Sequence, residues 1–246
     1  ADVVLHTTSS YFPLFMPQIV EILEAGLHVV STAEPLSFPW LTHPEEAAEI
    51  DAVARRAGKT ALATGVNPGF IMDALPLSLT SICQRVDQIR VTRTINASTR
   101  RGPFQKKIGA GMTVEDFETR MAAGEMGHVG LHESISMVFD TLGRALVGLE
   151  SEVESIVAQN RLETDHVTVE PGRVKGLRQV AHGYSAEGEF LTLTFVAALG
   201  MEDEGDLVRI TGEPNLTVRL RGTNGDTATV AIVVNAMPRV LASPPG

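Results

Sequence analysis

Three short, uniformly apolar runs punctuate the first 75 residues of the chain. They are DVVLH at 2–6, LHVVST at 27–32 and KTALATGV at 59–66. Runs of this length that stay apolar throughout, instead of alternating with polar residues, are typical of strands buried on both faces. We therefore predict three buried strands in this part of the chain.

The stretches between these runs carry helix signals. Residues 15–26 place apolar side chains at helical spacing and end in Gly26, a residue type that favours a helix C-terminus. Residues 42–58 open with Thr42 as the expected N-cap, carry acidic residues in the first turn and end in Gly58. Strands that alternate with helices in this way predict a parallel sheet covered on both faces.

Beyond Phe70 the pattern changes. Residues 71–86 predict a helix that is kinked or begins at Pro76, and half-exposed strands and tight turns follow. Apolar and polar residues alternate at 87–98, two helices are predicted at 113–125 and 130–148, and strand-like runs follow from about residue 153. The pair Asn224-Gly225 is a hairpin signal, and the apolar run from Val230 predicts a final strand that leads into a helix start. This part is predicted as an α+β domain with a largely antiparallel sheet.

Composition narrows the class of protein. With 43% hydrophobic and 20% charged residues, the chain fits a globular protein with a sizeable core. The net charge of −10 argues against a nucleic-acid partner, and the basic cluster at 100–107 is interpreted as a solvated loop. No apolar run approaches the roughly 20 residues of a membrane span. The single cysteine, Cys83, excludes an internal disulfide, is expected in the core, and indicates a reducing cytoplasm.

The ends of the three predicted strands are rich in small polar groups. They read HTTSS at 6–10, STAEPL at 31–36 and GVNPGF at 65–70. In a parallel sheet the carboxyl ends of the strands lie on one edge, where helix N-termini favour a polar or anionic ligand. The alternative is that these are ordinary turn and capping residues. Three such ends in succession favour a binding site.

Five segments keep the order of motifs of one enzyme family. They are ADVVLHTTSS (1–10), HVVSTAEPLSFPW (28–40), GVNPGFIMDALP (65–76), RTINASTRRGPFQKKIGAGMTVEDF (93–117) and GHVGLHESISMVFDTLG (127–143). Over nearly the whole chain they resemble the dihydrodipicolinate-reductase-like dehydrogenases. Within that group they are most similar to the 2,4-diaminopentanoate dehydrogenases and the related NAD(P)H-dependent amine dehydrogenases.

This resemblance implies an α/β fold with three parts. Residues 1–75 would form the C-terminal part of a doubly wound Rossmann domain, 76–228 an α+β substrate-binding and dimerisation domain, and 229–246 a return segment to the Rossmann domain. A family member would also carry an earlier strand and a G-x-G-x-x-G turn. We therefore expect the sequence to be a fragment; the alternative is a natural remnant that has lost dinucleotide binding. NAD and NADP are not distinguished.

The resemblance also implies which residues hold the cofactor and the substrate. Asn67, Pro68 and Gly69 would lie against the nicotinamide end, and Phe70 would form one wall of the substrate pocket. The predicted cofactor-binding residues, which bind NADP or NAD, are Thr7, Thr8, Ser9, Thr32, Asn67, Pro68, Gly69 and Asn235. The remaining pocket candidates are Thr94 and His182, and Arg93 is considered beside them.

Glu34 is the candidate catalytic residue. It is a carboxylate in the small, apolar loop AEPLSFPW at a strand end, and the family places its catalytic carboxylate in this loop. Such a group suits reductive amination, because it balances the charge of an iminium or ammonium ion beside the hydride donor. The predicted partners are therefore a small amine or carbonyl compound and ammonia, in a cytoplasmic homodimer.

The sequence leaves two alternative functions open, and one histidine pair has the spacing of a metal site. A dihydrodipicolinate-reductase activity is the weaker assignment, because INASTRRGPFQKKIGAG lacks the paired histidines and the Pro-Ser-Gly-Thr loop of those enzymes. A non-catalytic, dimerising relative is the third possibility. His128 and His132 have the i, i+4 spacing of metal ligands on a helix, but without an evident third ligand no metal site is predicted.

Overall fold

The computed structural model describes residues 2–246, which divide into two compact units. The first unit comprises residues 2–79, Val129–Ala145 and Asn224–Gly246, and the second comprises Thr80–His128 and Leu146–Thr223. Residues 129–145 thus group with the first unit, whereas the boundaries predicted from the sequence assign them to the second domain. The chain crosses between the units four times, so neither unit is one continuous segment.

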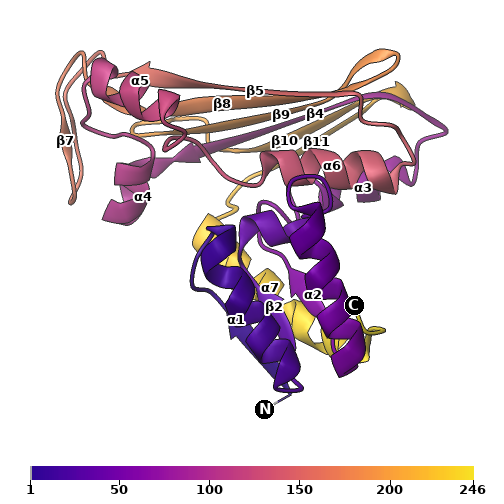
Figure 1. The fold of residues 1–246 in the computed structure, drawn as a ribbon. Coiled ribbons are helices and arrows are strands. Elements are labelled where there is room, and N and C mark those ends of the chain that lie inside the picture. Colours follow the sequence, from indigo (N-terminus) through magenta and orange to yellow (C-terminus); the bar gives the residue numbers. More distant parts are fainter. Residues whose placement is uncertain (1) are drawn as a thin grey trace. The chain divides into compact units, whose positions relative to one another are not determined.

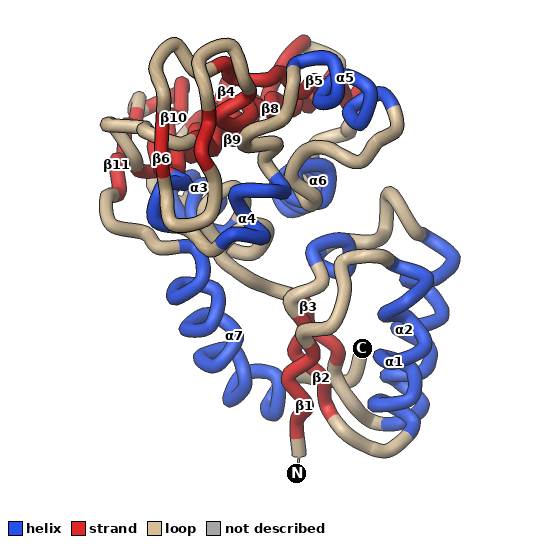
Figure 2. The backbone as a smooth tube through the Cα atoms, turned by 90° about the vertical axis from the view of Figure 1, so that its left-hand side faces the viewer, coloured by secondary structure: helices blue, strands red, loops and turns tan. Residues whose placement is uncertain are grey.

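A three-stranded parallel sheet forms the centre of the first unit. Its strands β1 (Val3–His6), β2 (His28–Ser31) and β3 (Ala61–Ala63) lie side by side in the order β1-β2-β3. Figure 2 shows helices α1 (Phe12–Glu24) and α2 (Pro44–Ala57) on one side of these strands and α7 (Gly225–Ala242) on the other. This arrangement confirms the predicted parallel sheet with helices on both faces.

The side chains of β2 alternate between the two faces of the sheet, so this short strand contributes to two hydrophobic cores. Successive residues of a strand point to opposite faces of the sheet. Val29 packs with Phe15 and Ile19 of α1, while Val30 packs with Val233 of α7. Both valines are fully buried, which is why the run in the sequence is apolar throughout instead of alternating.

The last part of the chain differs from its prediction. Residues 225–242 form the single helix α7, and the expected hairpin at Asn224-Gly225 and the strand after it are absent from this described segment. The Asn224 side chain accepts hydrogen bonds from the backbone N–H groups of Asp226 and Thr227, at 3.1 Å each. Asn224 is therefore a helix N-cap. Val233 and Val240, one heptad apart, cover Val30, so burial on one face overrides the strand preference of the β-branched run.

The first unit also contains shorter elements next to the strand ends. These are η1 (Glu34–Ser37), α3 (Ala74–Thr80) and α6 (Leu131–Thr141). Helix α2 ends at Ala57 with Gly58 in the left-handed conformation, as predicted, and α1 ends at Glu24, two residues before Gly26. Among residues 2–246 no helix has both the length and the apolar character needed to cross a membrane.

The second unit contains a six-stranded sheet, visible as the long ribbon of strands in Figure 1. Its strand order is β11-β10-β4-β9-β8-β5, and every neighbouring pair is antiparallel except β4 and β9. The strands are β4 (Arg85–Asn96), β5 (Gly148–Val157), β8 (Val174–Ser185), β9 (Gly188–Ala198), β10 (Gly205–Glu213) and β11 (Leu216–Leu220). The shorter elements are η2 (Ala97–Thr99), α4 (Gly102–Lys107), α5 (Val114–Ala122), β6 (Leu162–Glu163) and β7 (Thr168–Val169). The predicted α+β architecture is confirmed.

Candidate active site

The carboxyl ends of β1, β2 and β3 meet at one edge of the parallel sheet. The register pairs His6 with Ser31 and Ser31 with Ala63, so the three strands end level with one another. The backbone N–H of Thr32 donates to the carbonyl of His6 at 3.0 Å, and His6 Nδ1 lies 2.9 Å from Ser31 Oγ. The loops that follow the strands therefore start from a fixed edge.

The loop after β1 presents the hydroxyl groups that the sequence assigned to the cofactor. Thr7 and Thr8 are exposed, and Ser9 is half-buried. The Thr8 hydroxyl donates to Gln18 Oε1 at 2.7 Å, and Ser9 Oγ accepts the backbone N–H of Tyr11 at 3.0 Å. These contacts fix the loop, and Thr7 beside them is open to solvent.

Glu34 begins η1, directly after β2. The Ser10 hydroxyl donates a hydrogen bond to Glu34 Oε2, so the catalytic candidate bridges the loops after β1 and β2. The Ser37 hydroxyl donates to the Glu34 carbonyl at 2.7 Å and closes the turn behind it. Glu34 is half-buried, which leaves its carboxylate able to contact a ligand at the edge of the sheet.

The loop after β3 is held by a buried carboxylate. Asp73 is completely buried and accepts hydrogen bonds from Gly69 N–H at 2.8 Å and Ala74 N–H at 2.6 Å. The Ser134 hydroxyl of α6 donates to the same carboxylate at 2.7 Å. Asp73 therefore fixes the segment that carries Asn67, Pro68 and Gly69, although the sequence gave it no role.

Gly69 is required by a close approach within this loop. Its φ is +121°, and a Cβ atom at this position would lie 2.5 Å from the backbone nitrogen of Gly65. The atoms that require a glycine here belong to the chain's own turn at Gly65, and the predicted place of Gly69 against the nicotinamide stays a prediction. Asn67 and Pro68 are buried beside it, and Phe70 is 38% exposed at its end.

The first turn of α6 lies against two of these loops. Gly130 has a φ of +106°, and a Cβ there would lie 2.5 Å from Cδ of Pro68 and 3.3 Å from Cβ of Glu34. A side chain at Gly130 would therefore push apart the loops after β2 and β3. The start of α6 is part of the candidate site, which the sequence did not indicate.

Glu133, three residues further along α6, is a buried acid next to Glu34. It is 5% exposed, and the Thr42 hydroxyl donates to its Oε1 at 3.2 Å. Burial raises the pKa of Glu133, and the charge of Glu34 raises it further, while hydrogen bonds from its own backbone and from Thr42 act in the opposite direction. A half-buried carboxylate and a buried carboxyl group therefore lie together at this edge.

The contact with Glu133 corrects the expected role of Thr42. The N-cap of α2 is His43, whose side chain makes no capping hydrogen bond, and Pro44 is the first helical residue. Proline lacks a backbone N–H, so one of the donors that a capping side chain would satisfy is missing at this helix end. The Thr42 hydroxyl bonds to Glu133 instead.

The other predicted site residues lie elsewhere. Asn235 is exposed in the middle of α7, not on a strand, and its predicted part in cofactor binding stays a prediction. Thr94 and His182 lie on β4 and β8 of the second unit, where His182 Nδ1 is 3.1 Å from Glu189 Oε2. Their predicted role in the pocket also stays a prediction.

Arg93 does not present its guanidinium to a ligand. It is 2% exposed and lies opposite Asp206 on β10, with Nη1 3.3 Å from Oδ1. Burial lowers the pKa of Arg93 and raises that of Asp206, and each charge partly offsets the effect on the other. The pair is a structural ion pair inside the second unit.

The two histidines with i, i+4 spacing do not share a helix. His132 belongs to α6, which begins at Leu131, but His128 precedes that helix. The His128 ring stacks on Phe195 with the ring centroids 4.6 Å apart. The helix predicted from residue 130 thus begins at Leu131, after His128, and the two rings do not lie one turn apart on it.

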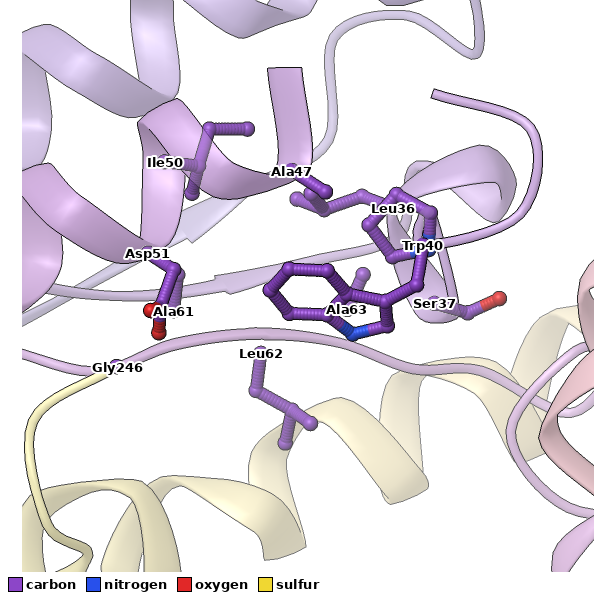
Figure 3. A pocket seen from close by; sticks show the side chains of 11 residues that line it. Leu36, Ser37, Trp40, Ala47, Ile50, Asp51, Ala61, Leu62, Ala63 and Gly246 are labelled. Atoms are coloured by element: carbon purple, nitrogen blue, oxygen red, sulfur yellow. The ribbon is translucent and has the colours of Figure 1, made fainter. Parts of the chain in front are cut away.

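A separate cavity of about 140 Å³ lies between η1, α2 and β3 (Figure 3). The Trp40 indole forms one of its walls, and Leu36, Ile50 and Leu62 contribute others. The cavity is lined by none of the residues predicted to bind cofactor or substrate. It lies behind η1 and not at the edge that carries the Glu34 carboxylate, so it is not the candidate active site.

The fold and the site together define a class of protein: a Rossmann-type dehydrogenase with a polar binding edge at its parallel strands. Residues 70–246 match the profile of the 2,4-diaminopentanoate dehydrogenase C-terminal domain. A 2,4-diaminopentanoate dehydrogenase from Acetoanaerobium sticklandii is 35% identical over an alignment of 256 residues. The alignment covers 100% of this chain and 72% of that protein. The chain belongs to the 2,4-diaminopentanoate dehydrogenase family.

Solved structures of other dehydrogenases and reductases share the fold. The amine dehydrogenase from Mycobacterium smegmatis has a TM-score of 0.86 at 23% identity, and the match covers 100% of this chain and 73% of that one. The biliverdin reductase from Synechocystis has a TM-score of 0.52 at 14% identity, with 98% and 70% covered. Family membership confirms the enzyme class predicted from the sequence, which is an NAD(P)-dependent dehydrogenase acting on amines. It also confirms the predicted fold class.

Proposed function

We propose that the protein oxidises a small primary amine of the 2,4-diaminopentanoate type to a ketone, with release of ammonia, and catalyses the reverse reductive amination. The observation that carries this proposal is the position of Glu34. Its carboxylate bridges the loops after β1 and β2 at the binding edge of the sheet, held by the Ser10 hydroxyl. Family membership supports the same reaction class.

The residues at this edge fit the nicotinamide half of a dinucleotide. Thr7, Thr8, Ser9 and Thr32 supply hydroxyl groups after two neighbouring parallel strands, where dinucleotides bind in such folds. Hydroxyl and amide groups can hydrogen-bond ribose hydroxyls and a carboxamide. When bound, NAD(P)+ accepts a hydride from the carbon that carries the amine. We propose that these threonines and Ser9, with the loop at 67–69, hold the cofactor.

We propose that Glu34 acts on the nitrogen of the substrate. Its carboxylate accepts a proton from the alkylammonium ion. After that proton has left the site, the restored negative charge balances the iminium ion that hydride loss creates. A fixed carboxylate in a site with little water stabilises this charge more strongly than water does. Phe70, which follows the loop held by Asp73, is proposed as the wall that sets the size of the substrate.

A direct assay tests this function. The purified protein should reduce NAD+ or NADP+ when 2,4-diaminopentanoate is added, and the absorbance of the reduced nicotinamide measures the rate. With ammonia and the matching ketone, the same protein should consume the reduced cofactor. Titration of the fluorescence of Trp40, the single tryptophan, with each reduced cofactor measures binding separately. Cofactor binding without any turnover would contradict the proposed substrate, and a flat titration would contradict the proposed cofactor site.

We also propose that the protein is a cytoplasmic homodimer formed through one face of the six-stranded sheet. On that face Thr92, Thr194 and Val180 lie level with one another across β4, β9 and β8. Short, uncharged side chains of this kind let a second sheet approach closely. The lone cysteine supports a reducing compartment, and the net charge of −10 argues against a nucleic-acid partner.

Light scattering should give about twice the 26.4 kDa mass of the chain. Thr194→Arg should shift this mass toward the monomer, because it places a charge in the centre of the proposed interface. Glu24→Arg, at an exposed position of α1 in the first unit and outside the six-stranded sheet, is the matched control and should remain dimeric. A monomeric wild-type protein would contradict the proposal.

A further inference from the structure

Three side chains form a continuous line of polar contacts behind Glu34. Glu133 Oε1 accepts a hydrogen bond from the Thr42 hydroxyl at 3.2 Å, and Thr42 Oγ1 lies 3.0 Å from Nδ1 of His43. The His43 ring stacks on Phe12 with centroids 4.1 Å apart and an interplanar angle of 15°. The line therefore runs from a buried carboxyl group to a fixed imidazole through one hydroxyl.

The two ends of this line differ in their access to water. Glu133 is 5% exposed, whereas His43 is half-buried and Thr42 is exposed. The charge of Glu34 of η1 acts on Glu133, His43 of the turn before α2 reaches it through Thr42, and His132 precedes it on α6. Burial lowers the pKa of His132, which favours its neutral form, so the charge that acts most directly on Glu133 is that of Glu34.

The hydrogen bonds can run in either direction along the same three atoms. When Glu133 is ionised, Thr42 donates to it and accepts a hydrogen bond from His43 Nδ1–H. When Glu133 carries a proton, it donates to Thr42, and Thr42 donates to an unprotonated Nδ1 of His43. A proton moves along the line when a protonated Glu133 becomes ionised. Glu133 then gives its proton to Thr42, and Thr42 gives its own proton to His43. His43 then carries a proton on both nitrogens and releases one from Nε2 to water.

The proposed reaction produces a proton that has to leave the site. An alkylammonium ion, NAD(P)+ and water give a ketone, an ammonium ion, NAD(P)H and one free proton. The hydride carries away the bonding electron pair from carbon, and the water oxygen becomes the ketone oxygen. Glu34 takes a proton from the substrate nitrogen on this proposal, so it has to pass that proton on before its charge can balance the iminium ion.

We propose that Glu133, Thr42 and His43 form a proton relay from the Glu34 side of the active site to the solvent. This inference rests on the proposed function. Glu34 lies close enough for its charge to act on Glu133, and Gly130 of the same helix end packs against Glu34. Because burial holds a proton on Glu133 to higher pH than on an exposed glutamate, this group is the stronger base of the two and suits a place in a relay.

Stopped-flow measurement with a pH indicator in weak buffer tests the relay, with proton release and hydride transfer recorded in the same turnover. Thr42→Val should slow proton release and steady-state turnover by about 10²-fold. This is the lower end of the range of rate effects for proton transfer by a positioned side chain. The substrate KM and cofactor affinity should stay unchanged. Thr42→Ser restores the hydroxyl and should retain wild-type rates. Glu46→Gln, which removes a carboxylate from the first turn of α2 outside the relay, is the matched control.

Chemical rescue separates proton transfer from a structural role. His43→Ala should be slow in weak buffer and should recover when imidazole is added, because free imidazole can accept the proton from Thr42. Infrared spectra of the protein without cofactor should contain a protonated carboxyl band that titrates above the usual range of glutamate and is missing in Glu133→Gln. This readout does not depend on turnover.

The outcomes separate the relay from the reaction it serves. A wild-type protein that reduces neither NAD+ nor NADP+ with the amine overturns the proposed function. An active wild-type protein that Thr42→Val leaves unchanged in proton release overturns the relay alone. Failure of imidazole to accelerate His43→Ala, or an infrared spectrum without the Glu133 band, also overturns the relay.

Discussion

Replacing Glu34 by glutamine should lower turnover by roughly 10²–10³-fold while leaving the affinity for NAD(P)H unchanged. Glutamine keeps the size of the side chain and can still accept the hydrogen bond from Ser10. It removes the negative charge that would balance the iminium ion and the site that would accept the substrate proton. The loss should therefore appear in kcat and not in cofactor binding.

Ser10→Ala is the matched variant for this experiment. It keeps the Glu34 charge but removes the hydrogen bond that orients the carboxylate, so its loss of turnover should be smaller, about 10-fold. Both variants are measured in the oxidative and the reductive direction, beside a fluorescence titration with the reduced cofactor. Near-normal turnover in Glu34→Gln would remove this residue from the mechanism. Loss of cofactor affinity in the same variant would make it structural.

Replacing Asp73 by alanine should destabilise the first unit by roughly 3–5 kcal/mol. The buried carboxylate is the acceptor for Gly69 N–H, Ala74 N–H and the Ser134 hydroxyl. Its removal leaves these donors in a space closed to water, and hydrogen bonds to a charged group contribute about 1.5–3 kcal/mol each. The loop that carries the proposed nicotinamide contacts would lose its support at the same time.

Denaturant unfolding followed by Trp40 fluorescence measures this effect, because the single tryptophan lies in the same unit as Asp73. Ser134→Ala removes one of the three donors and should cost about 1.5–3 kcal/mol. The loss of unfolding free energy in Asp73→Asn should lie between those of Asp73→Ala and Ser134→Ala. The amide oxygen replaces one acceptor, but the amide nitrogen is a donor and faces the Gly69 N–H, which is a donor too. Equal losses in Asp73→Ala and Ser134→Ala would show that the carboxylate does not support the loop.

The sequence predicted the parallel sheet well because its signals were local and mutually consistent. Each of the three strands reads as an apolar run. The central strand β2 is buried between helices on two faces, whereas Leu5 of β1 and Leu62 of β3 are exposed, so the prediction of full burial holds for β2 alone. The polar strand ends and Glu34 could be located for the same reason, since parallel strands carry their carboxyl ends to one edge. The contacts that join those ends, such as Ser10 to Glu34, link residues 24 positions apart and leave no local pattern.

Helix α7 shows where local signals mislead. Asn224-Gly225 and a β-branched run favour a hairpin and a strand, but the asparagine caps a helix whose valines cover β2. Intrinsic preferences are small, and burial against β2 outweighs them. A spacing of seven between Val233 and Val240 was the available helical signal.

The buried acids Asp73 and Glu133 were missed for a related reason. Each looks like an ordinary acidic residue near a helix start, and their functions depend on partners from distant segments. Glu133 stands three residues after Gly130, a position where acids usually interact with their own helix. Nothing in that spacing indicates Thr42, which lies 91 residues away.

One helix end makes the segment between β2 and α2 and the loop after β3 thermodynamically interdependent. The first turn of α6 touches the loops after β2 and β3 at Gly130, the turn before α2 through Glu133, and the support of the β3 loop through Ser134. Residues that share a partner in this way give non-additive free energies in double-mutant cycles. Attempts to re-engineer the substrate range by exchanging one of them would therefore disturb the other, and successful variants would carry compensating changes in α6.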